Sequence, residues 1–105
     1  MTEQELFKLR EICIQLGEII QKYGQKYYTS QIKALSDIVK CIDSDMDGKE
    51  KTKYIVGRYK VLYPAHGGLN EFYIQNDDFA TRLKLNEPLD ILKDDLWKII
   101  KLYIK

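Results

Sequence analysis

Apolar residues recur at helical spacing over residues 3 to 23, with polar residues between them. At 100° per residue these positions fall within an arc of about 140°, which is the pattern of an amphipathic helix. The predicted core-facing stripe consists of Leu6, Leu9, Ile12, Cys13, Leu16, Ile19, Ile20 and Tyr23. Thr2 and Glu5 have the spacing of a capping box, which predicts the start of the helix. Gly24 is expected to take the left-handed conformation that often follows a helix end.

Two further helices are predicted, over residues 30 to 42 and 49 to 63. The first has one apolar stripe made of Ile32, Leu35, Ile38, Val39 and Ile42. Its short link to the preceding helix favours antiparallel packing, and the polar run DSDMDG at 43 to 48 is expected to separate it from the next. Residues 49 to 63 also alternate like a strand near their end, but their apolar residues fill a helical arc of about 120°, and we favour a helix.

The periodicity is lost between residues 64 and 85, where we expect an irregular segment with one short element. Pro64 and the glycines at 67 and 68 predict an exposed turn. The following LNEFYI is consistent with a short helix capped by Asn70 or with a short strand. A last helix is predicted to begin with Asn86 as N-cap and Pro88 in its first turn. Its apolar stripe consists of Leu89, Leu92, Leu96, Ile99, Ile100 and Tyr103.

These four amphipathic segments and their short links predict an all-α fold, a small antiparallel bundle of about four helices. The chain has 105 residues and a mass of 12.4 kDa, which suits one helical domain spanning residues 1 to 105. Its hydrophobic content of 45% is that of a globular chain rather than a disordered one.

Composition also restricts the location and the partners. Seventeen Lys and Arg residues against sixteen Asp and Glu give a net charge of +1, which argues against attraction of the whole surface to nucleic acid or to an anionic membrane. The sequence has neither a secretory signal nor a long apolar run, so no membrane association is expected. Two cysteines do not make a disulfide framework and fit a reducing compartment. We therefore expect a cytoplasmic protein.

The run DSDMDG resembles the first half of a calcium-binding EF-hand loop. Asp43, Asp45 and Asp47 occupy the first ligand positions, and Gly48 occupies the turn. The second half fails, because position twelve, which should supply a bidentate carboxylate, is Tyr54. We therefore predict no metal site here. The segment is either a solvated connector or an acidic patch that meets a basic partner.

Catalytic groups are sparse in the sequence. His66 is the only histidine, so a site with several histidine ligands is impossible, and a nucleophilic pair would need a cysteine beside it. Cys13 and Cys41 both fall inside predicted helices and not at a helix start, where a thiolate would be favoured. The glycine pair lacks the spacing of a phosphate-binding loop. We expect neither enzymatic activity nor a cofactor.

Residues 49 to 60 are basic and carry interleaved tyrosines. Lys49, Lys53 and Lys60 would lie within about 40° of one another on a helix, which could contact phosphates, while Tyr54 and Tyr59 could stack on unpaired bases. A small nucleic-acid-binding or regulatory protein is therefore the alternative function. The interpretation that we favour is that the lysines flank a core-facing helix as solubilising residues, with their apolar stems packed down. Eight tyrosines in 105 residues favour a protein-binding role instead.

The segment PAHGGLNEFYIQND resembles a signature of Gly-Gly or Gly-Ser followed by Leu, Asn and Asp or Glu. This signature is found in an uncharacterised family of small, mostly helical bacterial proteins, and the resemblance covers residues 50 to 105. Proteins of this kind often serve as the immunity partner in bacterial toxin systems. The resemblance therefore implies an immunity protein that binds one cognate toxin and blocks its active site or substrate surface.

Such a protein needs a scaffold with charged loops that steer encounter and aromatic side chains that hold the complex. The predicted partner-binding residues come from two acidic clusters on an otherwise balanced chain. If the toxin is a nuclease, their carboxylates would occupy the site that accepts phosphate. The residues are Asp43, Asp45, Asp47 and Glu50 in the first cluster, and Glu71, Tyr73, Asp77 and Asp78 in the second.

Overall fold

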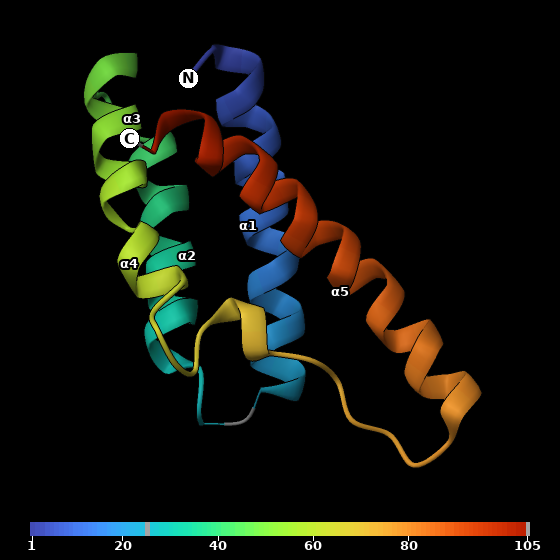
Figure 1. The fold of residues 1–105 in the computed structure, drawn as a ribbon. Coiled ribbons are helices and arrows are strands. Elements are labelled where there is room, and N and C mark those ends of the chain that lie inside the picture. The colour runs from blue at the N-terminus through green and yellow to red at the C-terminus, as the bar shows by residue number, and fades with distance from the viewer. Residues whose placement is uncertain (25, 105) are drawn as a thin grey trace.

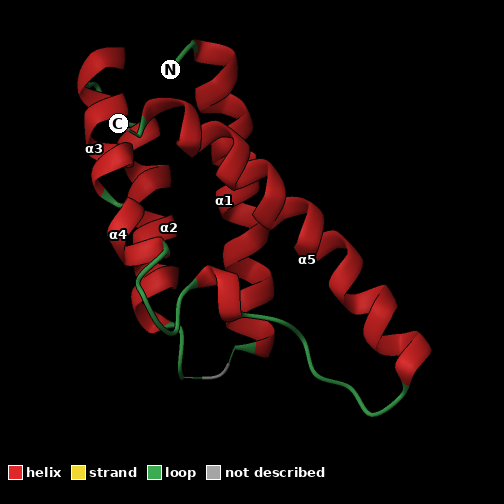
Figure 2. Ribbon diagram, in the orientation of Figure 1, coloured by secondary structure: helices red, strands yellow, loops and turns green. Residues whose placement is uncertain are grey.

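The computed structural model describes residues 1 to 24 and 26 to 104. The described residues form an all-α bundle without strands, as the sequence predicts (Figures 1 and 2). The α-helices are α1 (Glu3–Tyr23), α2 (Thr29–Ile42), α3 (Gly48–Gly57), α4 (Tyr59–Leu62) and α5 (Phe79–Ile100), and two 3-10 turns are η1 (Leu69–Glu71) and η2 (Lys101–Tyr103). No helix in this part of the chain combines the length and the apolar character needed to cross a membrane.

Helices α1 and α2 run antiparallel and form the centre of the bundle (Figure 1). The predicted capping box at Thr2 and Glu5 is present, and six of the eight predicted stripe residues of α1 are buried. The other two, Ile19 and Tyr23, pack partly buried against the core. The left-handed conformation expected at Gly24 is wrong, because its φ is −84°. Glycine fits there because a Cβ atom would lie 2.6 Å from the carbonyl oxygen of Ile20.

The helix predicted over residues 49 to 63 is interrupted. Asp47 caps α3, which ends at Gly57, and α4 starts again at Tyr59 after a turn at Arg58. Gly57 weakens the helix at this position, because glycine has the lowest helix propensity after proline. The predicted turn follows at Pro64, and Gly67 has a φ of 76°, which favours glycine.

The N-cap of the last helix lies eight residues earlier than predicted, so the irregular segment expected at 64 to 85 is shorter and the helix begins at Phe79. Asp78 caps α5 and accepts hydrogen bonds from the backbone and hydroxyl of Thr81. Asn86 is therefore not an N-cap, and Pro88 lies inside the helix. Asn70 is also not a cap, because it lies within η1, whose N-cap is Gly68. LNEFYI does start a short helix, the 3-10 turn η1, and the short strand considered for it does not form.

Helix α5 crosses the bundle diagonally, and its N-terminal end projects away from the other helices (Figure 1). Its C-terminal half carries the predicted stripe: Leu89, Leu92, Leu96, Ile99 and Ile100 are buried, while Tyr103 is half-buried in η2. The Tyr103 hydroxyl donates to the Glu5 carboxylate at 2.6 Å, which ties the end of the chain to the start of α1.

Candidate functional site

A hollow of about 700 Å³ lies at the end of the bundle where α1 passes into α2. One wall is the end of α1 and the link to α2, and the other is the segment that follows η1 (Figure 1). Four tyrosines line it, and we call it the tyrosine hollow: Tyr23, Tyr27, Tyr28 and Tyr73. Lys22 and Glu71 add charged groups to its lining.

Two of the four tyrosines are accessible to a partner. The side chains of Tyr27 and Tyr73 are 73% and 56% exposed. Tyr28 instead packs edge-on against the buried ring of Phe72, with 4.9 Å between ring centroids. Lys22 places its Nζ 5.2 Å from the centre of the Tyr23 ring. Each wall of the hollow therefore carries one exposed aromatic ring, Tyr27 on the link between α1 and α2 and Tyr73 on the segment after η1.

The wall after η1 is an extended segment, Phe72 to Gln75, in which buried and exposed side chains alternate. Phe72 and Ile74 point into the core, whereas Tyr73 and Gln75 point outward. Asn86 of α5 holds this segment, since its Oδ1 accepts from the Ile74 N–H and its Nδ2 donates to the Ile74 carbonyl, both at 2.8 Å. The Nζ of Lys93 donates to the Phe72 carbonyl at 2.8 Å.

Two of the predicted partner-binding residues, Glu71 and Tyr73, line the tyrosine hollow. The Glu71 carboxylate also accepts a hydrogen bond from the backbone N–H of Gly67, so it closes the glycine turn. The Tyr73 hydroxyl accepts from the Gln75 side chain at 3.3 Å. Glu71 thus has a structural role beside any role in binding, while the Tyr73 ring stays exposed.

The other two residues of the second cluster lie at the start of α5. Asp78 is the N-cap, and its hydrogen bonds with Thr81 lower the pKa of its carboxyl group. Its charge also complements the positive end of the helix dipole. Asp77 is exposed and makes no hydrogen bond or ion pair with any other described side chain. The Asp78 carboxylate therefore has a structural role as a helix cap, whereas the Asp77 carboxylate has no structural role among the described residues.

The first acidic cluster divides in the same way. Asp43 accepts hydrogen bonds from Arg10 of α1 at 2.8 and 3.3 Å, and this contact lowers the pKa of the Asp43 carboxyl. Asp47 caps α3 by accepting from the Glu50 N–H at 2.8 Å. Asp45 and the Glu50 side chain are exposed and form no ion pair within the described part of the chain.

The two clusters do not form one surface. Figure 1 shows the connector between α2 and α3 at the end of the bundle near the N-terminus, and η1 with the extended segment at the opposite end. The long axis of the molecule measures 46 Å. A partner that covers a single face would therefore meet one cluster or the other, and only the second adjoins the tyrosine hollow.

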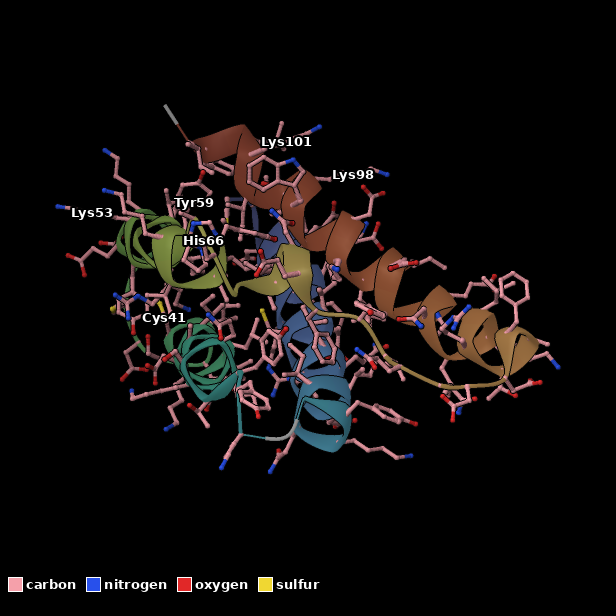
Figure 3. The ribbon with its side chains drawn as sticks, turned by 60° about the horizontal axis from the view of Figure 1, so that its bottom comes forward. Cys41, Lys53, Tyr59, His66, Lys98 and Lys101 are labelled. Carbon is pink, nitrogen blue, oxygen red and sulfur yellow. The ribbon has the colours of Figure 1, made fainter. Side chains whose placement is uncertain are left out.

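Neither cysteine has the environment of a reactive thiol. Burial raises the pKa of the Cys13 thiol to about 12, and it also raises the pKa of Cys41. A reactive cysteine needs the opposite shift. Figure 3 shows Cys41 on α2 and His66 on the turn after α4. Among residues 1 to 24 and 26 to 104, no group of three or more His, Cys, Asp or Glu side chains could hold a metal ion.

The basic segment is only partly available for binding. Lys51 donates to the Ile42 carbonyl at 2.7 Å, and Arg58 lies over the Tyr54 ring. Tyr59 packs in an aromatic cluster, with its ring centre 5.8 Å from that of Tyr63 and 6.1 Å from that of Trp97. Lys49, Lys53 and Lys60 remain exposed. In Figure 3, Lys53 projects from α3 away from Lys98 and Lys101.

The tyrosine hollow itself was not predicted from the sequence. The helical pattern places Tyr23 in the core stripe of α1, and no helical stripe includes Tyr27 or Tyr28. A usable signal was present, because the short link between α1 and α2 carries two adjacent tyrosines where turn residues are expected. Aromatic residues in a turn that no helical stripe requires indicate a surface role.

Comparison of the chain with models of protein families, with curated proteins and with solved structures found no match. The resemblance of the Gly67 to Glu71 signature to an immunity-related family therefore stays a prediction. The function has to be argued from the site alone.

Proposed function

We propose that this chain is an immunity protein, which binds a cognate toxin through the tyrosine hollow and blocks it. The observation that carries the proposal is the pair of exposed rings, Tyr27 and Tyr73, on opposite walls of a hollow whose frame is fixed by the core. Tyrosine combines a large contact area with a polar tip and few rotatable bonds, so it is enriched where proteins bind one another.

The wall that carries Tyr73 favours tight binding because its backbone is already fixed before a partner binds. Phe72 and Ile74 are 2% and 3% exposed, and Asn86 and Lys93 hold their backbone from the side of α5. A site that is already in its bound geometry loses less conformational entropy on association. An inhibitor needs only such a surface, since it makes and breaks no covalent bond.

Charge supplies the second part of the proposal. Asp77 and Glu71 lie in the chain on either side of the extended segment that carries Tyr73. Carboxylates near an aromatic contact steer a basic surface toward it and raise the association rate more than the affinity. In this proposal the partner presents a basic rim around a residue that inserts between the tyrosine rings.

The test uses the protein encoded by the neighbouring gene as the candidate toxin. Isothermal titration should detect one-to-one binding by the wild-type chain and losses of at least about thirtyfold for Tyr27→Ala and Tyr73→Ala, the range of interface hot spots. Tyr54→Ala is the matched control, because Tyr54 is an exposed tyrosine outside the hollow. Equal losses in all three variants, or none, would contradict the assignment of the site.

The alternative, a nucleic-acid-binding protein, relies on the exposed Lys49, Lys53 and Lys60. It is less favoured because Tyr59 packs against Tyr63 and Trp97 instead of offering a free ring face. A salt titration with single-stranded RNA separates the two functions. Affinity that is tight at low salt and falls steeply with rising salt would favour the alternative.

A further inference from the structure

The two edges of the extended segment Phe72 to Gln75 differ in their hydrogen bonding. In an extended chain the N–H and C=O of one residue point to one edge, and those of the next residue point to the other. On the edge facing α5, Asn86 binds both backbone groups of Ile74 and Lys93 binds the Phe72 carbonyl. The Asn86 amide therefore takes the place of a neighbouring strand.

The opposite edge carries the backbone groups of Tyr73 and Gln75. Within residues 1 to 24 and 26 to 104, neither backbone group of either residue forms a hydrogen bond. Such a row of unpaired donors and acceptors at strand spacing is a template for another extended chain.

There is room for a second chain on this edge. Ile74 lines two hollows: one of about 320 Å³ toward Lys84, Leu85 and Pro88 of α5, and the tyrosine hollow of about 700 Å³ on the side of the α1 to α2 link. The segment therefore runs between the two. Tyr73 and Gln75, the residues of the unpaired edge, line the larger hollow and not the smaller one.

We infer that the unpaired edge of Tyr73 and Gln75 binds an extended peptide segment of the partner protein, which adds to it as a strand. This inference rests on the proposed function and specifies how the partner binds. The backbone of the partner's peptide forms hydrogen bonds with the backbone of Tyr73 and Gln75. Alternate side chains of that peptide lie against the rings of Tyr27 and Tyr73. A carboxylate on the partner's peptide would lie near Lys22, which lines the hollow from the end of α1.

The hydrogen-bonding pattern selects this occupant. A polypeptide in extended form offers donors and acceptors in alternation at the repeat of about 3.3 Å per residue, which matches the edge. The phosphates of a nucleic-acid backbone are acceptors only and would satisfy the N–H groups, and the 2′-hydroxyls of RNA, its only backbone donors, do not alternate with acceptors at the repeat of an extended polypeptide. The partner's peptide should therefore contain β-branched or aromatic residues and should lack proline at its centre.

Substitution of Gln75 provides a test at the level of the backbone. Gln75→Pro removes the outward N–H, whereas Gln75→Ala removes the side chain and keeps that N–H. Proline suits the extended conformation, and it favours an extended residue before it, as Ile74 already is. The urea midpoints of both variants establish that they fold. A randomised library of displayed twelve-residue peptides serves as the probe, so the test does not depend on the toxin.

We expect selection on the wild-type chain to enrich peptides with alternating β-branched or aromatic residues. These should bind Gln75→Ala within about threefold of wild type and Gln75→Pro at least about fivefold more weakly than Gln75→Ala, the effect of one lost hydrogen bond. Tyr73→Pro against Tyr73→Ala repeats the comparison at the other residue of the edge. Failure to enrich any peptide that discriminates between proline and alanine variants would overturn the inference.

Two further outcomes separate this inference from the proposed function. If the neighbouring gene's product binds Gln75→Pro and Gln75→Ala equally well and the peptides do not discriminate, the function stands and strand addition is wrong. If the purified chain forms a dimer in light scattering that Gln75→Pro abolishes, a second copy fills the edge and the inference is overturned. Peptides that discriminate would support strand addition even if the neighbouring product does not bind.

Discussion

The side-chain amide of Asn86 binds both backbone groups of Ile74, with the N–H and the carbonyl each at 2.8 Å. The same Nδ2 also donates to the carbonyl of Arg82 one turn earlier in α5. One side chain thus fixes the extended segment to the projecting half of the last helix. It determines where Tyr73 stands and leaves the other edge of the segment unpaired.

Removing this amide should destabilise the chain. Asn86→Ala leaves the N–H and carbonyl of Ile74 without partners in a partly buried place, which costs about 1–3 kcal/mol. The free energy of unfolding in urea measures the loss. Glu87→Ala, an exposed neighbour on the same helix, is the control and should stay within about 0.5 kcal/mol of wild type. Equal effects of the two substitutions would mean that the amide pairing contributes nothing.

The acidic connector offers a matched pair of substitutions. Asp47 caps α3, so Asp47→Ala should lower the free energy of unfolding by about 1 kcal/mol. Asp45 has no such contact with the described residues, and Asp45→Ala should change it by less than about 0.5 kcal/mol. Urea unfolding of both variants tests this assignment, which fails if Asp45→Ala is the more damaging.

Stability should decline in acid. Contacts with Arg10, with Thr81 and with Tyr103 hold the pKa values of Asp43, Asp78 and Glu5 below their ordinary values of 3.8, 3.8 and 4.5. The unfolded chain therefore binds protons first, so this stabilisation is complete above about pH 5 and is lost as the pH falls through the lowered values. Asp43→Asn should make the decline shallower. A thermal midpoint of the wild-type chain that is flat from pH 5 to pH 2 would contradict this prediction.

The thiols should be inert in the folded chain. Cys13 is 2% exposed and burial raises its pKa to about 12, so almost no thiolate is present at neutral pH. Cys41 is also buried, with a raised pKa. We expect a thiol reagent at pH 8 to react more than about tenfold more slowly with the native chain than with the chain in denaturant. Comparable rates for the two states would show that the cysteines are accessible.

The sequence allowed most of the bundle to be predicted, because the helical stripes of α1, α2 and the second half of α5 are regular. The start of α5 was missed because Pro88 usually marks a first turn. Asp78 was an equally good N-cap candidate, because aspartate and asparagine are similarly favoured at this position, and it accepts from the N–H of Thr81. Residues 79 to 88 also project from the bundle, so they lack the buried stripe that would have revealed a helix.

The candidate site was less accessible to sequence reasoning. Acidic residues were selected by their clustering, yet Asp43, Asp47, Glu71 and Asp78 all have partners or caps within the fold. A local sequence pattern does not distinguish a capping carboxylate from a free one. The tyrosine hollow depends on bringing the α1 to α2 link against residues 71 to 75, and the residues of these two walls are more than forty positions apart.

The most direct test of the immunity function is a stoichiometric inhibition experiment. The purified chain is titrated into the purified product of the neighbouring gene, and the residual activity of that product is measured. We expect the activity to fall to zero at one equivalent of wild-type chain and to persist at one equivalent of the Tyr27→Ala, Tyr73→Ala double variant. Activity that persists with excess wild-type chain, or turnover of a substrate by the purified chain itself, would contradict the proposed function.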